Sequence, residues 1–262
     1  MLVKSPKYRK QLNSNQIGLL KIIFKFRFVS VPLLAEYLGK DKSTIYEQLL
    51  VLTSQKYISK SYDSSYRLPP KPATYALAKK GIRYLREATD LSQTALRNMY
   101  KNGTASEPLV EHSLEIFKLC IQLQRQYADQ FDIFTKSELS KYDQFLRPLS
   151  DLWLRRKKPT DDMPDSYLIE FIEAGTMSWI IRKRIQAHQD FFDEQDEEDY
   201  PYVLLIAGNN STERRTQLLL ENVFADFEFW TTTTERLAVS SLEIWKEVFE
   251  DDEDDAPILR RL

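Results

Sequence analysis

Hydrophobic side chains recur at helical spacing in the early part of the chain. The pattern predicts a first helix over about 15–26 and a short second helix over 31–38 that ends at Gly39. Asp41 is a suitable N-terminal cap for a third helix over about 42–55. Two helices joined by a tight turn that contains glycine are typical of a helix-turn-helix, so we expect the second and third helices to form this motif.

The third predicted helix has one apolar face and one polar face. The residues expected in its buried stripe are Ile45, Leu49, Leu50 and Leu52. In a helix-turn-helix, the first residues of the second helix reach the edges of DNA bases in the major groove. The polar side chains expected to have this role are those of Lys42, Ser43, Thr44, Tyr46 and Gln48.

Two short runs with the β-branched and aromatic content of strands follow this helix. They cover 57–62 and 74–77, and the polar, proline-rich segment between them predicts a wing. Basic residues in the wing and at the start of the next helix are suited to phosphate contacts, which position a protein on DNA without reading its sequence. These basic residues are Arg67, Lys71, Lys79 and Lys80.

The hydrophobic pattern changes further along the chain. Helical runs over about 82–100 and 107–130 predict a helical connector, and from residue 149 onward strand-like runs alternate with helical ones. Such alternation is typical of a mixed sheet covered by helices. The strands are expected at 152–155, 167–173, 202–207 and 227–232, and the helices at 177–192, 213–223 and 240–249.

These patterns together predict an α+β chain with four parts. The parts are an N-terminal winged helix-turn-helix domain over 1–103, a helical connector over 104–148, an α/β domain over 149–250, and an acidic and basic tail over 251–262.

The charges are distributed very unevenly between these parts. The whole chain has a net charge of −2, but residues 1–103 hold 19 lysines and arginines against 6 acidic residues, a net charge of +13. The remainder holds 18 basic and 33 acidic residues, a net charge of −15. A basic module releases counterions from DNA phosphates, whereas an acidic one is repelled by them. We therefore expect double-stranded DNA as a partner of the first part, and we regard the acidic part as a candidate for binding another protein.

Other features of the composition narrow the class of protein. Cys120 is the single cysteine, so an intrachain disulfide is excluded, and no apolar run is long enough to span a bilayer. We therefore expect a cytoplasmic protein without a membrane partner. The two histidines, His112 and His188, lack the ligand spacing of a zinc site, so no metal or other cofactor is expected.

Three segments of the chain carry a resemblance to a known family. They are 111–114, the pair of predicted strands 150–154 and 167–176, and the basic segment 182–185 with His188 after it. These segments resemble the replication-relaxation family of plasmid and mobile-element proteins, which pair a winged helix with a degenerate nuclease-like domain of the PD-(D/E)xK type. The resemblance implies a role in replication, mobilisation or their control.

The same resemblance points to candidate catalytic residues. A nuclease core of this type holds Mg²⁺ with an Asp and a Glu and positions water with a Lys. Asp151 corresponds to the first ligand, Glu170 or Glu173 to the second, and Lys183 could replace the missing Lys. Because side chains alternate along a strand, Glu170 and Glu173 should point to opposite faces and cannot both line one site. We therefore expect no cleavage.

Structural roles are the alternative for these carboxylates. We expect them to form ion pairs with the basic side chains of Arg155, Arg182 or Lys183.

Three functions remain open at this stage. The preferred one is a sequence-specific double-stranded DNA-binding protein, and the alternatives are a Mg²⁺-dependent DNA nuclease and a winged-helix transcription regulator with an acidic sensor or dimerisation domain. The second connector helix has a wide apolar face, which favours a homodimer. The residues of this face are Leu114, Phe117, Ile121 and Leu123.

Overall fold

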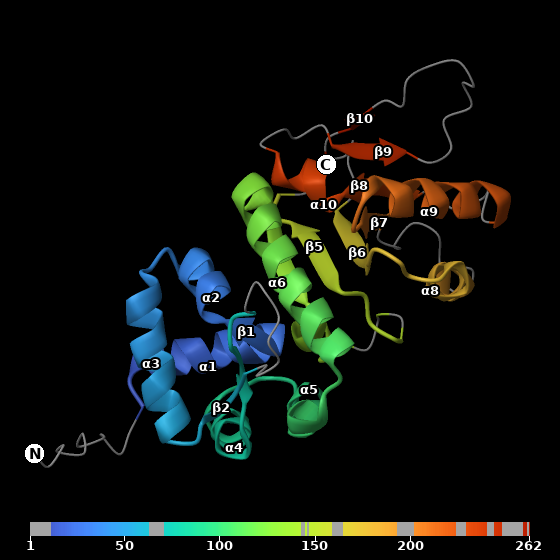
Figure 1. Cartoon of the computed structure of the whole chain (residues 1–262). Coiled ribbons are helices and arrows are strands. Elements are labelled where there is room, and N and C mark those ends of the chain that lie inside the picture. Colours follow the sequence, from blue (N-terminus) through green and yellow to red (C-terminus); the bar gives the residue numbers. More distant parts are fainter. Residues whose placement is uncertain are drawn as a thin grey trace, which may run out of the picture. The chain divides into compact units, whose positions relative to one another are not determined.

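The fold is taken from a computed structural model of the whole chain, shown in Figure 1. It describes residues 12–62, 71–142, 145, 147–158, 165–192, 202–223, 229–239, 244–247, 259–260 and 262. The chain forms two compact units, Met1–Ser106 and Glu107–Leu262. Among the described helices, none combines the length and the apolar character needed to cross a membrane.

The first unit contains helices packed with a small antiparallel sheet, whose strands follow the order β1-β3-β2. Its elements are α1 (Ser14–Phe26), β1 (Phe28–Ser30), α2 (Val31–Leu38), α3 (Lys42–Ser54), β2 (Ile58–Ser61), β3 (Thr74–Leu77), α4 (Lys79–Ala88), α5 (Gln93–Asn98) and the 3₁₀ helix η1 (Met99–Thr104). A helix-turn-helix of α2 and α3, followed by the hairpin of β2 and β3, is the arrangement of a winged helix-turn-helix.

Local sequence signals explain the first helices. The Asn13 side chain accepts a hydrogen bond from the Gln16 amide at 2.8 Å, and the Gln16 side chain accepts one from the Asn13 amide at 3.0 Å. This reciprocal pair satisfies two amides that the start of a helix leaves without partners. Helix α2 starts with Pro32 in its first turn and ends at Gly39, which has a φ of 60° that glycine adopts at low cost. The predicted helix-turn-helix is therefore present.

The first unit differs from the sequence prediction in two places. Strand β1 was not predicted, because its three residues follow α1 directly and continue its apolar composition. The helix expected over 82–100 is divided into α4, α5 and η1. The break lies at Thr89, where α4 ends in an extended conformation, and Ser92 caps α5 by accepting the Ala95 amide at 3.2 Å.

The second unit is built on a seven-stranded sheet of order β10-β9-β8-β7-β6-β5-β4. Strands β6, β7 and β8 run parallel to one another, and the other pairings are antiparallel. Its elements are α6 (Glu107–Tyr127), β4 (Phe131–Thr135), α7 (Lys136–Leu139), β5 (Leu152–Arg156), β6 (Ser166–Ile172), α8 (Ser178–Phe192), β7 (Tyr202–Ala207), α9 (Asn210–Val223), β8 (Phe229–Thr233), α10 (Thr234–Ala238), β9 (Trp245–Glu247) and β10 (Leu259–Arg260).

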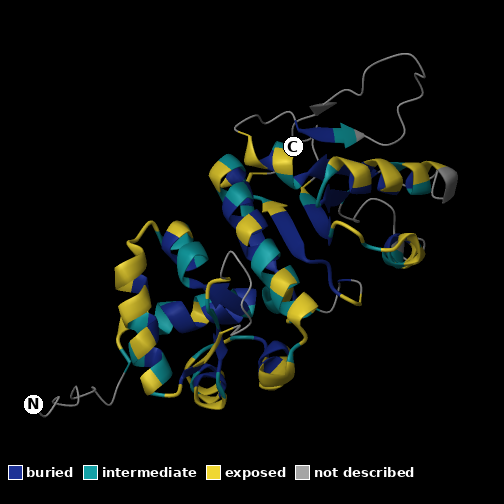
Figure 2. Ribbon diagram, viewed as in Figure 1, coloured by how far each residue is buried: buried dark blue, intermediate teal, exposed yellow. Residues whose placement is uncertain are grey.

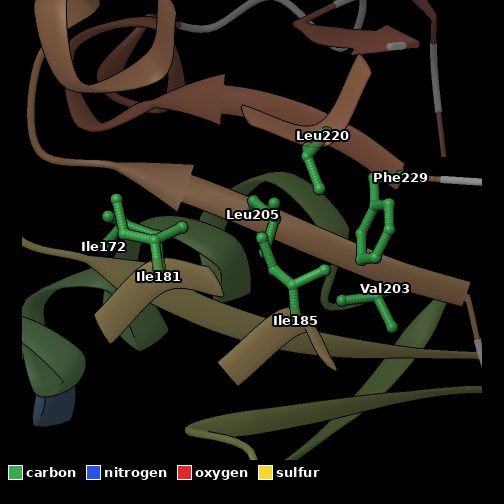
Figure 3. Close-up of a cluster of buried hydrophobic side chains, with 7 residues drawn as sticks. All are labelled: Ile172, Ile181, Ile185, Val203, Leu205, Leu220 and Phe229. Carbon is green, nitrogen blue, oxygen red and sulfur yellow. The ribbon is translucent and has the colours of Figure 1, made fainter. Parts of the chain in front are cut away.

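Helices cover both faces of this sheet. On one face, α8 and α9 pack against β6, β7 and β8 through a cluster of fully buried aliphatic and aromatic side chains. Figure 3 shows this cluster, which consists of Ile172, Ile181, Ile185, Val203, Leu205, Leu220 and Phe229. Helix α6 contacts the opposite face, where its His112 ring lies 5.8 Å from the ring of Phe171 on β6. The sheet is mixed and covered by helices, as expected.

The boundaries expected in the second half need three corrections. The segment 104–148 is not a helical connector, because it contains β4, which pairs with β5 at the edge of the sheet. The helix expected over 240–249 is wrong, since Trp245–Glu247 is a strand that pairs with β8. The tail is not separate, because its residues Leu259 and Arg260 pair with β9. Each of these strands is short, and its hydrogen bonds go to a distant part of the chain.

The apolar face of α6 is also used differently from the expectation. Phe117, Ile121 and Leu123 are buried within the chain, and Leu114 is half-buried. These side chains pack inside the second unit, so this face does not supply a dimer interface.

We expect Gly81→Ala to lower the free energy of unfolding of the first unit by about 1–3 kcal/mol. A methyl group at Gly81 would overlap the backbone oxygen of Tyr57. Gly18→Ala is the matched control, because no atom lies within 4 Å of the added methyl group, and it should stabilise α1 by about 0.5–1 kcal/mol. Amide hydrogen exchange of the first unit measures both changes. Equal effects of the two substitutions would contradict the close packing of α4.

Candidate functional site

The first turns of α3 form an exposed polar surface. Ile45, Leu49 and Leu52 are buried and anchor the helix in the first unit. The side chains of Lys42, Ser43, Thr44 and Tyr46 are exposed, and that of Gln48 is half-buried. Figure 2 shows the exposed side of α3 in yellow. The structure therefore brings the predicted base-reading residues together on one helix.

The turn before α3 presents this surface to solvent. The amide of Lys40 donates to the carbonyl of Ala35 at 3.0 Å, which closes the end of α2. Asp41 then takes an extended conformation and α3 starts at the next residue. The short turn fixes the direction of α3 relative to α2, as a helix-turn-helix requires.

Two features of α3 differ from the sequence prediction. Leu50 was expected in the buried stripe but is 55 % exposed. Lys60 of β2 was not among the candidates, yet its Nζ lies 5.8 Å from the centre of the Tyr46 ring. β2 begins a few residues after α3 and folds back against it, which places Lys60 beside Tyr46; the sequence pattern alone did not identify this approach.

The wing extends from the ends of β2 and β3. Ser61 and Thr74 are the last paired residues of the hairpin. The exposed residues Lys60 and Lys71 lie on the two sides of the segment that connects the strands. Arg67, the other basic residue predicted for the wing, lies outside the described residues.

The two lysines at the start of α4 differ in their surroundings. Both are exposed, but Lys80 donates a hydrogen bond to the backbone oxygen of Gln55 at 3.1 Å and lies 4.1 Å from the centre of the Tyr57 ring. Lys80 therefore holds α4 against the segment that follows α3. Lys79 is the better candidate for a phosphate contact.

A second polar cluster lies in the second unit, at the end of the sheet where β6 ends and β5 begins. The imidazole of His112 lies between two carboxylates, with Nε2 3.0 Å from Oδ1 of Asp151 and Nδ1 2.7 Å from Oε1 of Glu173. The second oxygen of Asp151 accepts the Phe171 amide at 3.0 Å. A neutral imidazole has only one N–H, so a ring that donates to both carboxylates is the protonated form.

The charges of this cluster stabilise one another. Burial lowers the pKa of His112, but hydrogen bonds to Asp151 and Glu173 and the charges of both outweigh it and raise the pKa. Burial has the opposite effect on the carboxylate and raises the pKa of Asp151. The hydrogen bond and charge of His112, the charge of Lys136 and the Phe171 amide lower that pKa below its ordinary value.

Glu170 belongs to the other face of the sheet. Its Oε1 lies 3.1 Å from Nε2 of His188, and its Oε2 lies 3.9 Å from a guanidinium nitrogen of Arg184, both on α8. Glu173 instead contacts His112 of α6. The prediction that Glu170 and Glu173 point to opposite faces is therefore confirmed.

The predicted partners of the carboxylates are wrong. Asp151, Glu170 and Glu173 are held by the two histidines, whereas Arg155 pairs with Asp132 at 3.3 Å. A protonated imidazole has two N–H groups that point in opposite directions, so His112 can donate to two carboxylates at once. The sequence contains only two histidines, which made both of them candidates for a special role. Only the fold shows which carboxylates each histidine contacts.

The candidate residues do not fit a Mg²⁺ site of the nuclease type. Both oxygens of Asp151 already accept hydrogen bonds, Glu170 faces the opposite side, and Lys183 is exposed on α8. Among the described residues, no group of three or more His, Cys, Asp and Glu side chains is placed to hold a metal ion.

We expect the stability of the second unit to fall as the pH rises above about 6.5, because the folded unit binds a proton at His112 more tightly than the unfolded chain does. The stabilisation is fully present below that pH and is lost as the pH rises through the raised pKa. All four tryptophans lie in the second unit, so tryptophan fluorescence during urea unfolding reports on this unit alone. His112→Gln should remove this pH dependence, and an unchanged dependence in the variant would show that another group causes it.

No protein-family model matches the chain, and no curated protein matches it. Among solved structures, a single-residue mutant of ZitR from Lactococcus lactis is similar over 48 % of this chain and 82 % of that chain, with 17 % identity and a TM-score of 0.27. A TM-score this low carries no argument about fold or function. Membership of the replication-relaxation family therefore stays a hypothesis that rests on the sequence segments alone.

Proposed function

We propose that the chain is a sequence-specific double-stranded DNA-binding protein that acts by occupying its site. The observation that carries this proposal is the exposed polar start of α3, which follows the tight turn of a helix-turn-helix in a part of the chain with a net charge of +13. A helix of this kind fits the major groove of DNA, and the surplus of positive charge supplies the sequence-independent part of the affinity.

The polar and basic residues of this surface divide into two roles. Ser43, Thr44 and Gln48 have hydroxyl and amide groups that can hydrogen-bond with base edges, and Lys42 and Tyr46 lie on the same helix. Lys71 beside the wing and Lys79 at the start of α4 are suited to phosphates, as is Arg67 in the part of the wing outside the described residues. Lys60, which lies near the Tyr46 ring, extends the basic surface next to α3.

The biological setting of this binding is a separate proposal. The resemblance of three sequence segments favours a plasmid or mobile element, where the protein would act in replication, mobilisation or their control. A winged-helix transcription regulator uses the same DNA contacts, and repression of a reporter by the bound protein would favour that role. A homodimer also stays a prediction, although the apolar face of α6 does not supply its interface.

Retention of duplexes from a random pool by the full chain tests the proposed function. Recovery of one enriched sequence is expected. A pool that is retained without enrichment at any salt concentration would contradict sequence-specific binding.

Substitutions of base-reading residues and of phosphate-contacting residues should change the DNA affinity in different ways. Thr44→Val removes a hydroxyl and should cost about 1 kcal/mol at the preferred site and little elsewhere. Lys71→Ala should weaken binding to all duplexes alike and reduce the salt slope of log K by about 0.9. Lys118→Ala, an exposed lysine of α6 in the second unit, is the charge control and should change neither quantity. Titration of labelled duplexes at several salt concentrations measures both effects, and a uniform loss in both test variants would refute the division of roles.

We also expect the protein to leave DNA intact when it is incubated with Mg²⁺ or Mn²⁺. The reason is that each oxygen of Asp151 already accepts a hydrogen bond and Glu170 lies on the other face of the sheet. Gel analysis of supercoiled, linear and single-stranded DNA checks this expectation. Cleavage by the parent protein that disappears in Asp151→Asn would establish the nuclease alternative instead.

A further inference from the structure

The start of α8 carries large apolar side chains that are exposed. Met177 and Trp179 are 61 % and 63 % exposed, and the indole nitrogen of Trp179 donates to the sulfur of Met177 at 3.2 Å. Tryptophan is highly buried on average, so an indole exposed to this extent is unusual. One turn further along the same helix face, Arg182 and Lys183 are also exposed.

Helix α9 adds basic side chains beside this face. Helices α8 and α9 contact each other and pack on the same face of the sheet. Arg214 and Arg215 of α9 are exposed, and the Arg215 guanidinium donates to the backbone oxygen of Thr176, just before α8, at 2.6 Å. We call this region the α8–α9 surface, which consists of Met177, Trp179, Arg182, Lys183, Arg214 and Arg215.

Among the described residues, the cations of the α8–α9 surface lack paired carboxylates. Within the described part of the chain, no carboxylate pairs with Arg182, Lys183 or Arg214. The acidic side chains nearest in sequence are used elsewhere, since Glu213 is buried against Arg236 and Asp190 accepts a hydrogen bond from Gln186. Four exposed cations thus lie on the same two adjacent helices as an exposed indole, in a unit whose net charge is −15. Such a local reversal of sign indicates a surface for an anionic partner.

We propose that the α8–α9 surface binds single-stranded nucleic acid, with a base stacked on Trp179 and backbone phosphates held by the surrounding arginines and Lys183. Stacking on an aromatic ring needs an exposed base face, which a single strand offers and a duplex hides. Trp, Met and Arg are also enriched in the cores of protein interfaces, so an acidic protein segment is the competing partner that the test includes. An exposed ring together with cations that can follow a phosphate backbone is the combination that binds a single strand. The proposal is independent of the proposed function, which assigns duplex binding to α3 of the first unit.

Anisotropy titrations of the full chain test this inference with a labelled oligothymidylate of about 15 nucleotides and a mixed-sequence duplex. Trp179→Ala should weaken binding of the oligothymidylate roughly tenfold and leave duplex binding unchanged, because only the single strand offers a base to stack. Trp179→Phe keeps an aromatic face and should retain most of the affinity. Lys183→Ala should reduce the salt slope for the single strand by about 0.7, whereas Lys118→Ala should not.

Photo-crosslinking adds a readout that does not depend on affinity. An oligonucleotide of the same length that carries iodouracil should crosslink to the peptide containing Trp179, and Thr44→Val should not change the yield. Because Trp179 is exposed, its substitution should leave the unfolding curve unchanged, which separates a binding defect from a folding defect.

Three outcomes would overturn the proposal. One is a folded Trp179→Ala variant that binds the oligothymidylate as tightly as the parent, and another is an equal loss of single-strand and duplex binding. The third is that polyglutamate displaces the labelled oligothymidylate as effectively as unlabelled oligothymidylate does, when the two competitors are compared at equal concentrations of negative charge. That result would assign the surface to an acidic protein segment. None of these outcomes bears on duplex binding by α3, which is measured separately.

Discussion

The alternation of side chains along β6 decides most of what the second unit can do. This strand lies inside the sheet and both of its faces are covered, so every side chain must be satisfied by one of two helical layers. Ile172 packs against α8 and α9, whereas Phe171 faces α6. Glu170 lies in β6 and contacts α8, whereas Glu173, the first residue after the strand, contacts α6 on the opposite face. A single site that uses both carboxylates is excluded by this geometry.

The two buried carboxylates, Asp151 and Glu170, need partners because burying an isolated charge is costly. The chain meets this need with both of its histidines: His112 from α6 serves Asp151 and Glu173, and His188 from α8 serves Glu170. Arg184 also turns toward Glu170. The other cations of the basic segment are consequently left on the outside of α8, where they contribute to the α8–α9 surface.

The two units then have complementary electrostatic roles. The first unit is basic overall and exposes the polar start of α3. The second unit has a net negative charge, which disfavours contact with phosphates. Within that acidic unit, the exposed indole of Trp179 and the cations around it form a local exception. In our proposals, α3 binds duplex DNA and the α8–α9 surface binds a single strand. A protein with both properties would be suited to a site where the strands of DNA separate.

Much of the local structure could be predicted from the sequence. Helical spacing, Pro32 and Gly39 located α2 and α3, and continuous or alternating apolar runs located β3 and β7, because these signals act between residues a few positions apart. The strands β1, β4, β9 and β10 and the roles of His112 and Lys60 depend on distant partners. Short edge strands gain their hydrogen bonds only when the neighbouring strand is in place, and a carboxylate acquires its donor only when two helices dock on the sheet. The sequence by itself determined the helix-turn-helix, the separation of charge and the opposite orientation of Glu170 and Glu173. Only the tertiary structure decided which side chains neutralise these carboxylates and which cations remain exposed, since both depend on contacts between residues far apart in the chain.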